Sequence, residues 1–551
     1  MAFIKQLYFV WVLLAVFCIS CNQEKISAEL IIENAVIWTG DDINPIVQAM
    51  AICGDTILAI GAIDEISKYK SVNTVVKNME GKFITPGFID SHVHLMMGGN
   101  ALLSVELRDA NTPQEFTKRI AEYAKTLKTD EWILEGNWDH TLWGGELPKK
   151  EWIDSITKNN PLVLYRLDGH MVLANSIALE IAGINKDTPD IPGGEIVRDS
   201  KGEPTGILKD NAMNRLLEKI PTMNILQKEA ALEAAMDYLV SNGVTSVHDV
   251  DSLGTYEVAQ KLNKRKELKI RIYAMNPLNY WDKRNAVKVN NDKWLKTGGL
   301  KGFIDGSLGS HTAFFRDDYF DKPSDRGFII NDSEKMYKWI SKADTANLQV
   351  MVHAIGDEAN HTLLDIYERV IKENGAKDRR FRVEHAQHLL KKDIDRFSNL
   401  GILVSAQPYH AIDDGRWAEE VIGPGRIKST YAFKSLIDAG TKVTFGSDWP
   451  VAPSSPIAGI YAAVTRRTLD GKNPDGWVPE QKINVEQALK AFTRNGAFAS
   501  FEENRKGTLT PGKLADFVVL SDDLTKVNPI EIIEIQVLQT FVGGNIIYDR
   551  K

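Results

Sequence analysis

Cysteine is scarce in this chain of 551 residues, which holds 3 cysteines: Cys18, Cys21 and Cys53. Two of them lie within the first 21 residues, next to a short apolar run. If the chain is processed at Cys21, Cys53 is the one free thiol left, and an internal disulfide is excluded. The stability of the fold therefore has to come from packing.

Long hydrophobic runs and basic clusters are also missing. After residue 21, no stretch approaches the roughly 20 apolar residues that a bilayer span needs. Lys and Arg number 66 against 74 Asp and Glu, a net charge of −8, and no Lys/Arg cluster stands out, so nucleic acid is not an expected partner. No glycine-rich phosphate loop is apparent, so nucleotide cofactors are not indicated. With 43% hydrophobic and 25% charged residues, the composition is that of an ordinary globular protein.

The first 21 residues have the pattern of an export signal. Lys5 precedes the apolar run 7–19, and Ser20 and Cys21 follow it. The stretch 18–21 resembles the lipobox of bacterial lipoproteins, in which the last cysteine, here Cys21, takes the lipid, although Cys18 stands where an aliphatic residue is usual. We expect an exported protein, periplasmic or held to a membrane only by an N-terminal lipid anchor. Plain secretion with cleavage nearby is the alternative.

Both ends of the mature chain have the sequence pattern of short β-strands. Residues 28–84 and 505–551 consist of apolar runs separated by turns, and we expect them to form one small β-sandwich domain. Between them, over residues 85–504, strand-like runs alternate with helical stretches, which is typical of a parallel sheet with crossover helices. The predicted strands number eight: 83–90, 244–250, 270–275, 300–305, 349–354, 381–385, 403–407 and 442–446. Eight strands predict an α/β fold, a (β/α)8 TIM barrel.

The interval is too long for a barrel of about 250 residues. The excess lies after the first strand, where residues 100–243 carry predicted helices at 113–128 and 226–240 and a strand-like stretch at 162–165. We interpret this segment as an inserted subdomain that covers the barrel mouth as a lid.

Polar side chains recur where barrel strands approach the C-terminal mouth, the face on which TIM barrels place their chemistry. The first strand leads into His92 and His94, whose spacing puts two imidazoles on one side of a strand end. The positions that share this placement on the other strands are Lys301, His353, His385 and Asp448. A single His-x-His pair is weak evidence, but six such residues on five strands indicate a metal site.

The pattern resembles the amidohydrolase superfamily, and within it the family-3 branch that includes N-substituted formamide deformylases. The resemblance rests on six stretches and on Pro511–Asp516 near the C-terminus, which together span almost the whole mature chain: Pro86–His94, Asp168–His170, Lys301–Ser307, Val352–Asp357, Glu384–Gln387 and Gly446–Pro450.

The resemblance implies a two-metal site. It makes His92 and His94 ligands of one cation together with Asp448, and makes His353 and His385 ligands of a second. Lys301 would bridge the two cations as a carbamate formed with CO2, because an ammonium cannot bind a cation. The alternative for Lys301 is an ordinary cation paired with Asp305 or a substrate carboxylate, in which case the site holds one metal.

Imidazole and carboxylate ligands without thiolate favour Zn²⁺, with other divalent transition metals allowed. A divalent cation lowers the pKa of a bound water to about 7, so hydroxide can attack a carbonyl at neutral pH. Asp448 is expected to take the proton of this nucleophile and to pass it to the departing nitrogen.

Five groups of residues around this site have two interpretations each. His170 polarises the substrate carbonyl or makes a supporting hydrogen bond. Trp138, with His140 and Trp143, forms an aromatic wall or belongs to the lid core. Asp305 and Ser307 contact substrate or shape a turn, Arg198 contacts substrate or forms a surface ion pair, and Arg382 and Glu384 orient His385 or form a salt bridge in the barrel. The other histidines, among them His248, His311, His361, His388 and His410, are interpreted as structural.

Together these features predict a metal-dependent hydrolase of non-peptide C–N bonds that acts on a small amide, formamide or cyclic amide. A hydrolytic deaminase or an esterase or lactonase in the same barrel is the enzymatic alternative. A lipoprotein that binds a ligand without turnover is the alternative of another class, since a fold does not fix a function. The sequence leaves the oligomeric state open, and a homo-oligomer is among the states it allows.

Overall fold

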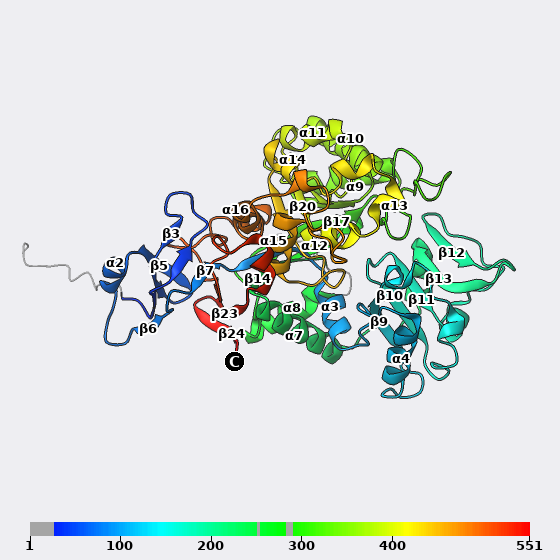
Figure 1. Cartoon of the computed structure of the whole chain (residues 1–551), viewed down its shortest axis with the longest axis horizontal. Coiled ribbons are helices and arrows are strands. Elements are labelled where there is room, and N and C mark those ends of the chain that lie inside the picture. The colour runs from blue at the N-terminus through cyan, green and yellow to red at the C-terminus, as the bar shows by residue number, and fades with distance from the viewer. Residues whose placement is uncertain (1–26, 251–253, 283–289) are drawn as a thin grey trace, which may run out of the picture.

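The computed structural model describes residues 27–250, 254–282 and 290–551. The predicted export signal, residues 1–21, lies outside the described residues. Three parts follow one another across the molecule: β-rich terminal segments, a central barrel, and a separate sheet on the far side of the barrel (Figure 1). Within the described ranges, no helix has both the length and the apolar character needed to cross a membrane.

The central part is a nearly closed barrel of eight parallel strands, as predicted. Neighbouring strands pair in parallel from β21 through to β8. The ring closes at the strand ends, where the His94 N–H donates to the Trp449 carbonyl at 2.8 Å and the Asp448 N–H to the His92 carbonyl at 2.7 Å. The barrel strands are β8 (Phe88–Val93), β14 (Val244–Val250), β15 (Arg271–Pro277), β17 (Leu295–Phe303), β18 (Gln349–Ala354), β19 (Arg382–His385), β20 (Leu403–Ala406) and β21 (Val443–Phe445).

Two predicted strands differ in extent from the observed ones. The predicted strand 83–90 is two strands, because Gly87 separates β7 (Phe83–Pro86), which joins a terminal sheet, from barrel strand β8. A Cβ at Gly87 would lie 2.1 Å from Thr245 Oγ1, so glycine is required where the chain passes between the two sheets. The predicted strand 300–305 begins earlier, at Leu295, which places Lys301 near the C-terminal end of β17 rather than at its start.

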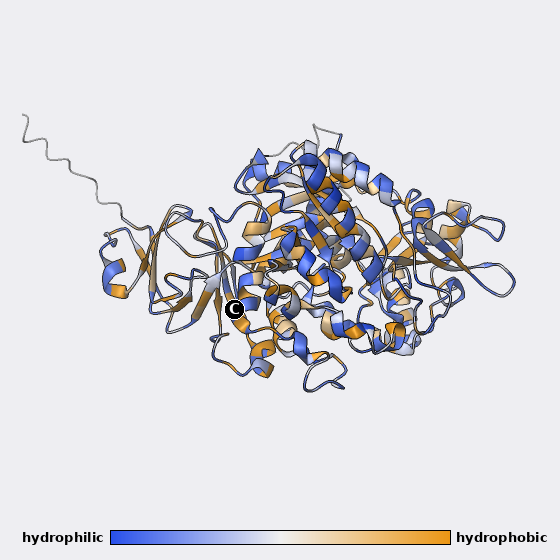
Figure 2. Ribbon diagram, turned by 90° about the horizontal axis from the view of Figure 1, so that it is seen from above, coloured by the Kyte–Doolittle hydropathy of each residue, from blue (hydrophilic) through white to orange (hydrophobic). Residues whose placement is uncertain are grey.

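Helices surround the barrel and face it with apolar residues. Helix α7 shows why they form: Asn224 caps its N-terminus by accepting from the N–H groups of Leu226 and Gln227, and buried apolar residues recur at helical spacing along it. Figure 2 shows hydrophilic and hydrophobic residues alternating along the helices of the central body. The helices are α3 (Leu95–Leu102), α7 (Ile225–Ser241), α8 (Thr255–Arg265), α9 (Ser333–Thr345), α10 (Asp357–Asn374), α11 (Ile394–Asn399), α12 (Pro408–Asp414), α13 (Ala418–Ile422), α14 (Phe433–Asp438), α15 (Pro456–Thr465), α16 (Val485–Ala491) and α17 (Arg494–Ala499).

The segment after the first barrel strand forms a five-stranded sheet of its own, in the order β12-β13-β11-β10-β9. Separate hydrophobic clusters fill its two faces. Helix α7, which the sequence grouped with this segment, packs on α3 and against β14 and so belongs structurally with the barrel. The elements of the sheet region are α4 (Pro113–Ala124), β9 (Ile133–Trp138), β10 (Leu162–Arg166), β11 (Met171–Ala174), α5 (Ser176–Ala182), β12 (Gly194–Arg198), β13 (Pro204–Asp210) and α6 (Asn211–Leu217).

The two ends of the chain meet in a pair of β-sheets. One sheet has the order β5-β4-β1-β6, and the other combines both ends of the chain in the order β24-β23-β22-β7-β2-β3. Strand β7 pairs antiparallel with β22, and the rings of Phe517 and Phe541 stack with centroids 4.1 Å apart. The elements are β1 (Leu30–Glu33), β2 (Val36–Trp38), β3 (Ile46–Val47), β4 (Ala49–Cys53), β5 (Thr56–Gly61), α2 (Ile63–Ser67), β6 (Val75–Asn78), β22 (Phe517–Leu520), β23 (Val537–Val542) and β24 (Asn545–Asp549).

Candidate metal centre

His92 and His94 converge on one carboxylate at the barrel mouth. His92 lies near the C-terminal end of β8, and His94 follows that strand. Their Nε2 atoms lie 3.4 Å and 3.1 Å from the same oxygen, Oδ1 of Asp448. One ligand atom from each of the three residues lies within 4.8 Å of the others, so a single cation can contact all three. The structure therefore brings together the first predicted set of ligands.

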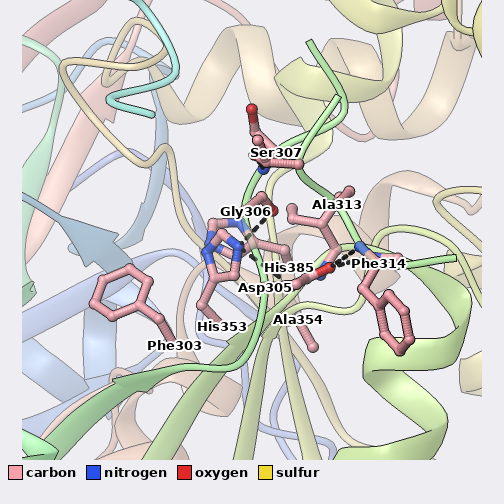
Figure 3. A network of polar contacts seen from close by, with 12 residues as sticks. Phe303, Asp305, Gly306, Ser307, Ala313, Phe314, His353, Ala354 and His385 are labelled. Carbon is pink, nitrogen blue, oxygen red and sulfur yellow. Dashed lines mark hydrogen bonds and ion pairs between the residues drawn. The ribbon is translucent and has the colours of Figure 1, made fainter. Parts of the chain in front are cut away.

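A second group of donors lies on the other side of the same carboxylate. His385, the last residue of β19, has Nδ1 3.9 Å from Oδ2 of Asp448. The third member is His410 of α12, whose ligand atom also lies within 4.8 Å of theirs. His353, at the C-terminal part of β18, lies next to this group, with its ring centroid 4.5 Å from that of His385. Its Nε2, however, lies 3.0 Å from the backbone carbonyl of Gly306, as Figure 3 shows.

Lys301 points into the same region from β17. Its side chain is 3% exposed, with Nζ 3.4 Å from His92 Nε2 and 4.3 Å from the centroid of the Phe303 ring. Among the described residues, no carboxylate lies within ion-pair distance of this amine, so the predicted alternative of a pair with Asp305 is wrong. Burial lowers the pKa of Lys301 to about 8, against the charges of Glu384 and Asp448.

Carboxylates behind the ligands hold the histidine rings in place. Nδ1 of His92 lies 2.5 Å from Oε2 of Glu384, whose other oxygen pairs with Nε of Arg382 at 2.8 Å. A carboxylate accepts, so it fixes the hydrogen on Nδ1 and leaves Nε2 of His92 facing Asp448. Glu384 thus orients His92, rather than the neighbouring His385 as the sequence suggested.

His170 reaches the site from the separate sheet. It lies between β10 and β11, with its ring centroid 5.1 Å from that of His353. Its Nδ1 lies 2.6 Å from Oδ1 of Asp210. Burial opposes a charge on the ring, but the hydrogen bond and the charge of Asp210 outweigh it and raise the pKa of His170. Asp210 therefore holds the His170 ring through Nδ1 and favours its charged form.

A cavity of about 420 Å³ lies over these groups, and its walls come from both the barrel and the separate sheet. One side carries charge: Arg166 Nη1 pairs with Asp168 at 2.7 Å, and its Nη2 with Asp139 at 3.3 Å. Arg416, which follows α12, reaches across to Asp139 at 3.4 Å. Apolar residues also line the cavity, among them Met97, Leu278, Phe303, Trp339 and Trp417.

Comparison with known proteins gives a match of residues 76–548 to the amidohydrolase family. The chain belongs to this family. It is 40% identical to the protein LONG AFTER FAR-RED 3 of Arabidopsis thaliana over 546 residues, which cover 95% of this chain and 92% of that protein. It is 28% identical to an N-substituted formamide deformylase of Arthrobacter pascens over 549 residues, with coverage of 95% and 98%.

Solved structures agree with this assignment. A metal-dependent hydrolase of Pyrococcus horikoshii superposes with a TM-score of 0.75 at 26% identity, covering 91% of this chain and 99% of that one. The chain is accordingly an amidohydrolase-family hydrolase with a candidate metal site of histidine and aspartate side chains.

Three residues that were predicted to contact substrate do not line the cavity: Trp138, Arg198 and Asp305. Trp138 is fully buried in the core of the separate sheet and donates from Nε1 to the Leu164 carbonyl at 2.9 Å, and it is not among the described residues that line the cavity. Arg198 donates to four backbone carbonyls of neighbouring loops instead of forming a surface ion pair. Both substrate roles are wrong in this structure.

Asp305 is fully buried and anchors loops instead of lining the cavity. Its carboxylate accepts from the N–H groups of Phe314, Ile355 and Gly356 at 2.8 to 3.0 Å, as drawn in part in Figure 3. Burial raises the pKa of Asp305 to about 7, although these N–H donors oppose the shift. Ser307 does line the cavity, and its hydroxyl donates to Asp168 at 2.6 Å.

Sequence reasoning missed two parts of the site. His410 was interpreted as structural, although it comes three residues after the predicted strand 403–407 and so met the same test of position as the predicted ligands. The charged wall was also missed, because its members lie on different elements: Asp139, Arg166, Asp168 and Arg416. Of these charged residues, only Asp168 belongs to a stretch that the sequence analysis had singled out, Asp168-Gly169-His170.

Proposed function

We propose that this protein hydrolyses a non-peptide C–N bond in a small amide, formamide or cyclic amide, with Zn²⁺ as its metal. The observation that carries the proposal is the convergence of His92 and His94 on one oxygen of Asp448 at the mouth of a barrel. Membership of the amidohydrolase family supports the hydrolytic class of the reaction.

The described residues fit a divalent cation. Imidazole nitrogens and a carboxylate, without thiolate, are the donor set that zinc accepts. The rings are already oriented for it, because Glu384 holds the hydrogen of His92 on Nδ1. A bound cation supplies a Lewis acid and makes hydroxide available near neutral pH. His92, His94 and Asp448 would hold one cation, and His385 lies where it can contribute to a second.

Two residues of the chain handle protons and charge. Asp448, acting from the oxygen that a cation leaves free, accepts the proton of the attacking water and delivers it to the departing nitrogen. His170 donates a hydrogen bond from Nε2 to the carbonyl oxygen, on which negative charge develops. The Asp210 carboxylate keeps His170 in the donating form.

Lys301 is proposed to act as a carbamate. Its neutral amine adds to CO2 with loss of one proton, and the product carries one negative charge shared by two oxygens on the carbon bonded to Nζ. Support comes from the burial of the amine and from the lack of a nearby carboxylate partner among the described residues. The carbamate is lost when the protein is denatured for mass spectrometry. The measurement is therefore ¹³C NMR of protein equilibrated with ¹³CO2, and Lys301→Ala is the control that should lack the carbamate signal.

The N-terminus supports a proposal of export. The apolar run 7–19 followed by Cys21 favours a lipid-anchored protein that meets a small-molecule substrate outside the cytoplasm. Mass spectrometry of the mature N-terminus of the natively expressed protein tests it: a diacylglyceryl group on Cys21 is expected, and an unprocessed Met1 would contradict it.

The reaction class is tested by a screen of metal-replete protein against formamides, N-acyl amines, hydantoins and lactones. Turnover of a C–N substrate that is abolished by a chelator and restored by Zn²⁺ is expected. Turnover confined to lactones would replace the proposal with an esterase or lactonase, and ammonia released from an amino-substituted ring would replace it with a deaminase. Absence of turnover together with absence of bound metal would favour a ligand-binding protein.

A further inference from the structure

We propose that the substrate carries a positively charged amine and that Asp414 binds this group. Asp414 is the last residue of α12, the helix that follows barrel strand β20, and it lines the same cavity as the candidate metal ligands. The inference rests on the proposed function, because it names a class of substrate for that cavity.

Two arginines of the cavity lining are already neutralised by carboxylates of the chain. Arg166 pairs with Asp168 at 2.7 Å and with Asp139 at 3.3 Å. Arg416 pairs with Asp139 at 3.4 Å and makes a closer contact with Asp413. Because each guanidinium has two carboxylate partners, neither provides an unpaired positive charge for a substrate anion.

Asp414 differs from these acids, because no cation of the described chain pairs with it. Its Oδ2 accepts from the hydroxyl of Tyr431 at 2.5 Å and from Nε2 of Gln387 at 2.9 Å, and both donors are neutral. Its Oδ1 accepts no hydrogen bond from the residues that the structure describes. A carboxylate oxygen can accept more than one hydrogen bond, so Oδ1 is open to a donor from a ligand in the cavity.

The pKa of Asp414 is that of a carboxylate that lacks a cation. Burial raises this pKa to about 7, and the neighbouring charge of Asp413 adds to the shift. The hydrogen bond from Tyr431 and the charges of Arg166 and Arg416 oppose it. A cation at Oδ1 would favour the ionised form and so reverse the shift.

The wall around Asp414 also has more acidic than basic groups. Outside the candidate metal centre, the described lining of the cavity holds four carboxylates and two guanidiniums: Asp139, Asp168, Asp413 and Asp414 against Arg166 and Arg416. A surplus of one sign of charge in a cleft raises the local concentration of ligands of the opposite sign. The cavity therefore attracts a cationic substrate rather than an anionic one.

An aromatic ring and apolar side chains suit the rest of such a substrate. The N–H of Trp417 donates to the carbonyl of Asp414 at 2.9 Å, and Trp417 lines the cavity. Aromatic ring faces attract ammonium groups. Met275 and Leu278 line the cavity from β15 and the turn after it, and β15 stands four places from β20 in the ring of eight strands. They therefore lie across the barrel from Asp414, and an amide with an apolar group at one end and an ammonium at the other fits both sides.

Fluorescence titration of Zn²⁺-replete protein with three dansyl sulfonamides tests the role of Asp414 without chemistry, because a sulfonamide has no carbonyl to attack. Dansylcadaverine carries an ammonium, N-hexyldansylamide has a methyl group in its place, and dansyl-ε-aminocaproate carries a carboxylate. Wild type is expected to bind dansylcadaverine at least about tenfold more tightly than the carboxylate compound. This comparison needs no variant, and equal or reversed affinities would overturn the proposal.

Asp414→Asn keeps the acceptor for Tyr431 and Gln387 but loses the charge. It is expected to weaken dansylcadaverine binding at least about tenfold and to leave N-hexyldansylamide binding unchanged, which also shows that the cavity is intact. Asp395→Asn, an exposed change outside the cavity lining, is the matched control and should alter neither affinity. Equal weakening of both compounds in Asp414→Asn would assign Asp414 a structural role and overturn the proposal.

The substrate screen separates this inference from the proposed function. Hydrolysis of amides with no preference for those that carry an amine would overturn the role of Asp414 and leave the proposed function standing. Binding of dansylcadaverine that depends on Asp414, without hydrolysis of any amide, would support the role of Asp414 and overturn the proposed function.

Discussion

Asp448 lies between two groups of histidines, and its backbone has an unfavourable conformation that the surrounding residues hold in place. The residue follows β21 with a positive φ of 61°, and its N–H donates to the His92 carbonyl at 2.7 Å. His385, at the end of β19, also has a positive φ, of 71°. Such conformations cost about 1–3 kcal/mol for residues other than glycine and persist where the surroundings hold them. Both residues line the common cavity.

Replacement of Asp448 by asparagine separates metal binding from proton transfer. The amide of Asp448→Asn keeps one oxygen for a cation but has no basic oxygen left to take a proton from water. We expect metal to be retained and turnover to fall by about 10²–10⁴-fold, the usual contribution of a general base. Metal content by mass spectrometry and initial rates on the substrate found in the screen are the measurements. Full activity in Asp448→Asn would remove the proposed base.

The positions of the site residues could be predicted only where strands determine them. His92, Lys301 and His385 lie at the ends of barrel strands, and parallel strands bring their ends to one edge. Trp138 could not be placed this way, because Glu135, Gly136 and Asn137 all have positive φ and break the alternation of β9. The pairing of Glu384 with His92 spans 292 residues, and no local pattern indicates it.

At the scale of elements, Gly87 joins a terminal sheet to the barrel strand that carries His92. We expect Gly87→Ala to destabilise the protein by about 1–3 kcal/mol, because the added methyl group overlaps the Thr245 side chain. The midpoint of thermal unfolding measures the loss. Gly425→Ala is the matched control, since a Cβ there meets nothing within 4 Å and φ is −72°. Equal midpoints for the two variants would contradict the close approach at Gly87.

Docking of the separate sheet on the barrel is expected to depend on pH through Asp168. Ser307 and Ser310 of a barrel loop donate to this carboxylate, which also pairs with Arg166. Burial opposes its ionisation, but the charges of Arg166 and His170 outweigh it and lower the pKa of Asp168 to about 2.

Because this pKa is lowered on folding, the stabilisation is fully present above the ordinary value of 3.8 and is lost as pH falls toward 2. We expect the free energy of unfolding of wild type to exceed that of Asp168→Asn by about 2 kcal/mol at pH 6. This difference should shrink between pH 4 and 2. Denaturant unfolding at several pH values measures it. Asp187→Asn, an exposed change in the same sheet region, should show no such trend. A difference that stays constant with pH would contradict the linkage.

The barrel strands were predictable from sequence because they are buried on both faces and carry apolar residues around the polar ones that form the site. The five-stranded sheet was not: only β10 was expected among its strands, since β12 is short and half-exposed and β9 is irregular. The split of the predicted strand 83–90 could not be foreseen either. It depends on the contact between Gly87 and Thr245, which lie 158 residues apart.

For the whole molecule, a buried ion pair joins the sheet formed by the chain ends to the barrel. Arg271 at the start of β15 donates from Nε and Nη2 to the two oxygens of Asp516, at 2.6 Å and 2.8 Å, and the Gly543 N–H donates to the same carboxylate. The pair links residues 245 positions apart, just before β22 begins. Its geometry is bidentate, the arrangement that gives the strongest side-chain pairs.

Removal of one partner leaves the other charge buried, whereas removal of both does not. We therefore expect Arg271→Met to destabilise the protein by about 3–5 kcal/mol and the double variant Arg271→Met, Asp516→Leu to be more stable than Arg271→Met alone. Denaturant unfolding of the four members of this cycle measures the coupling. The exposed pair of Lys293 and Asp55, 2.8 Å apart, is the control, and Lys293→Met should cost about 1 kcal/mol or less. Arg271 lies at the N-terminal start of β15, whereas the candidate ligands lie at the C-terminal mouth of the barrel. Metal affinity should therefore be unchanged in every folded variant. A loss of metal in Arg271→Met without a loss of stability would show that the terminal sheets position the site as well as hold the fold.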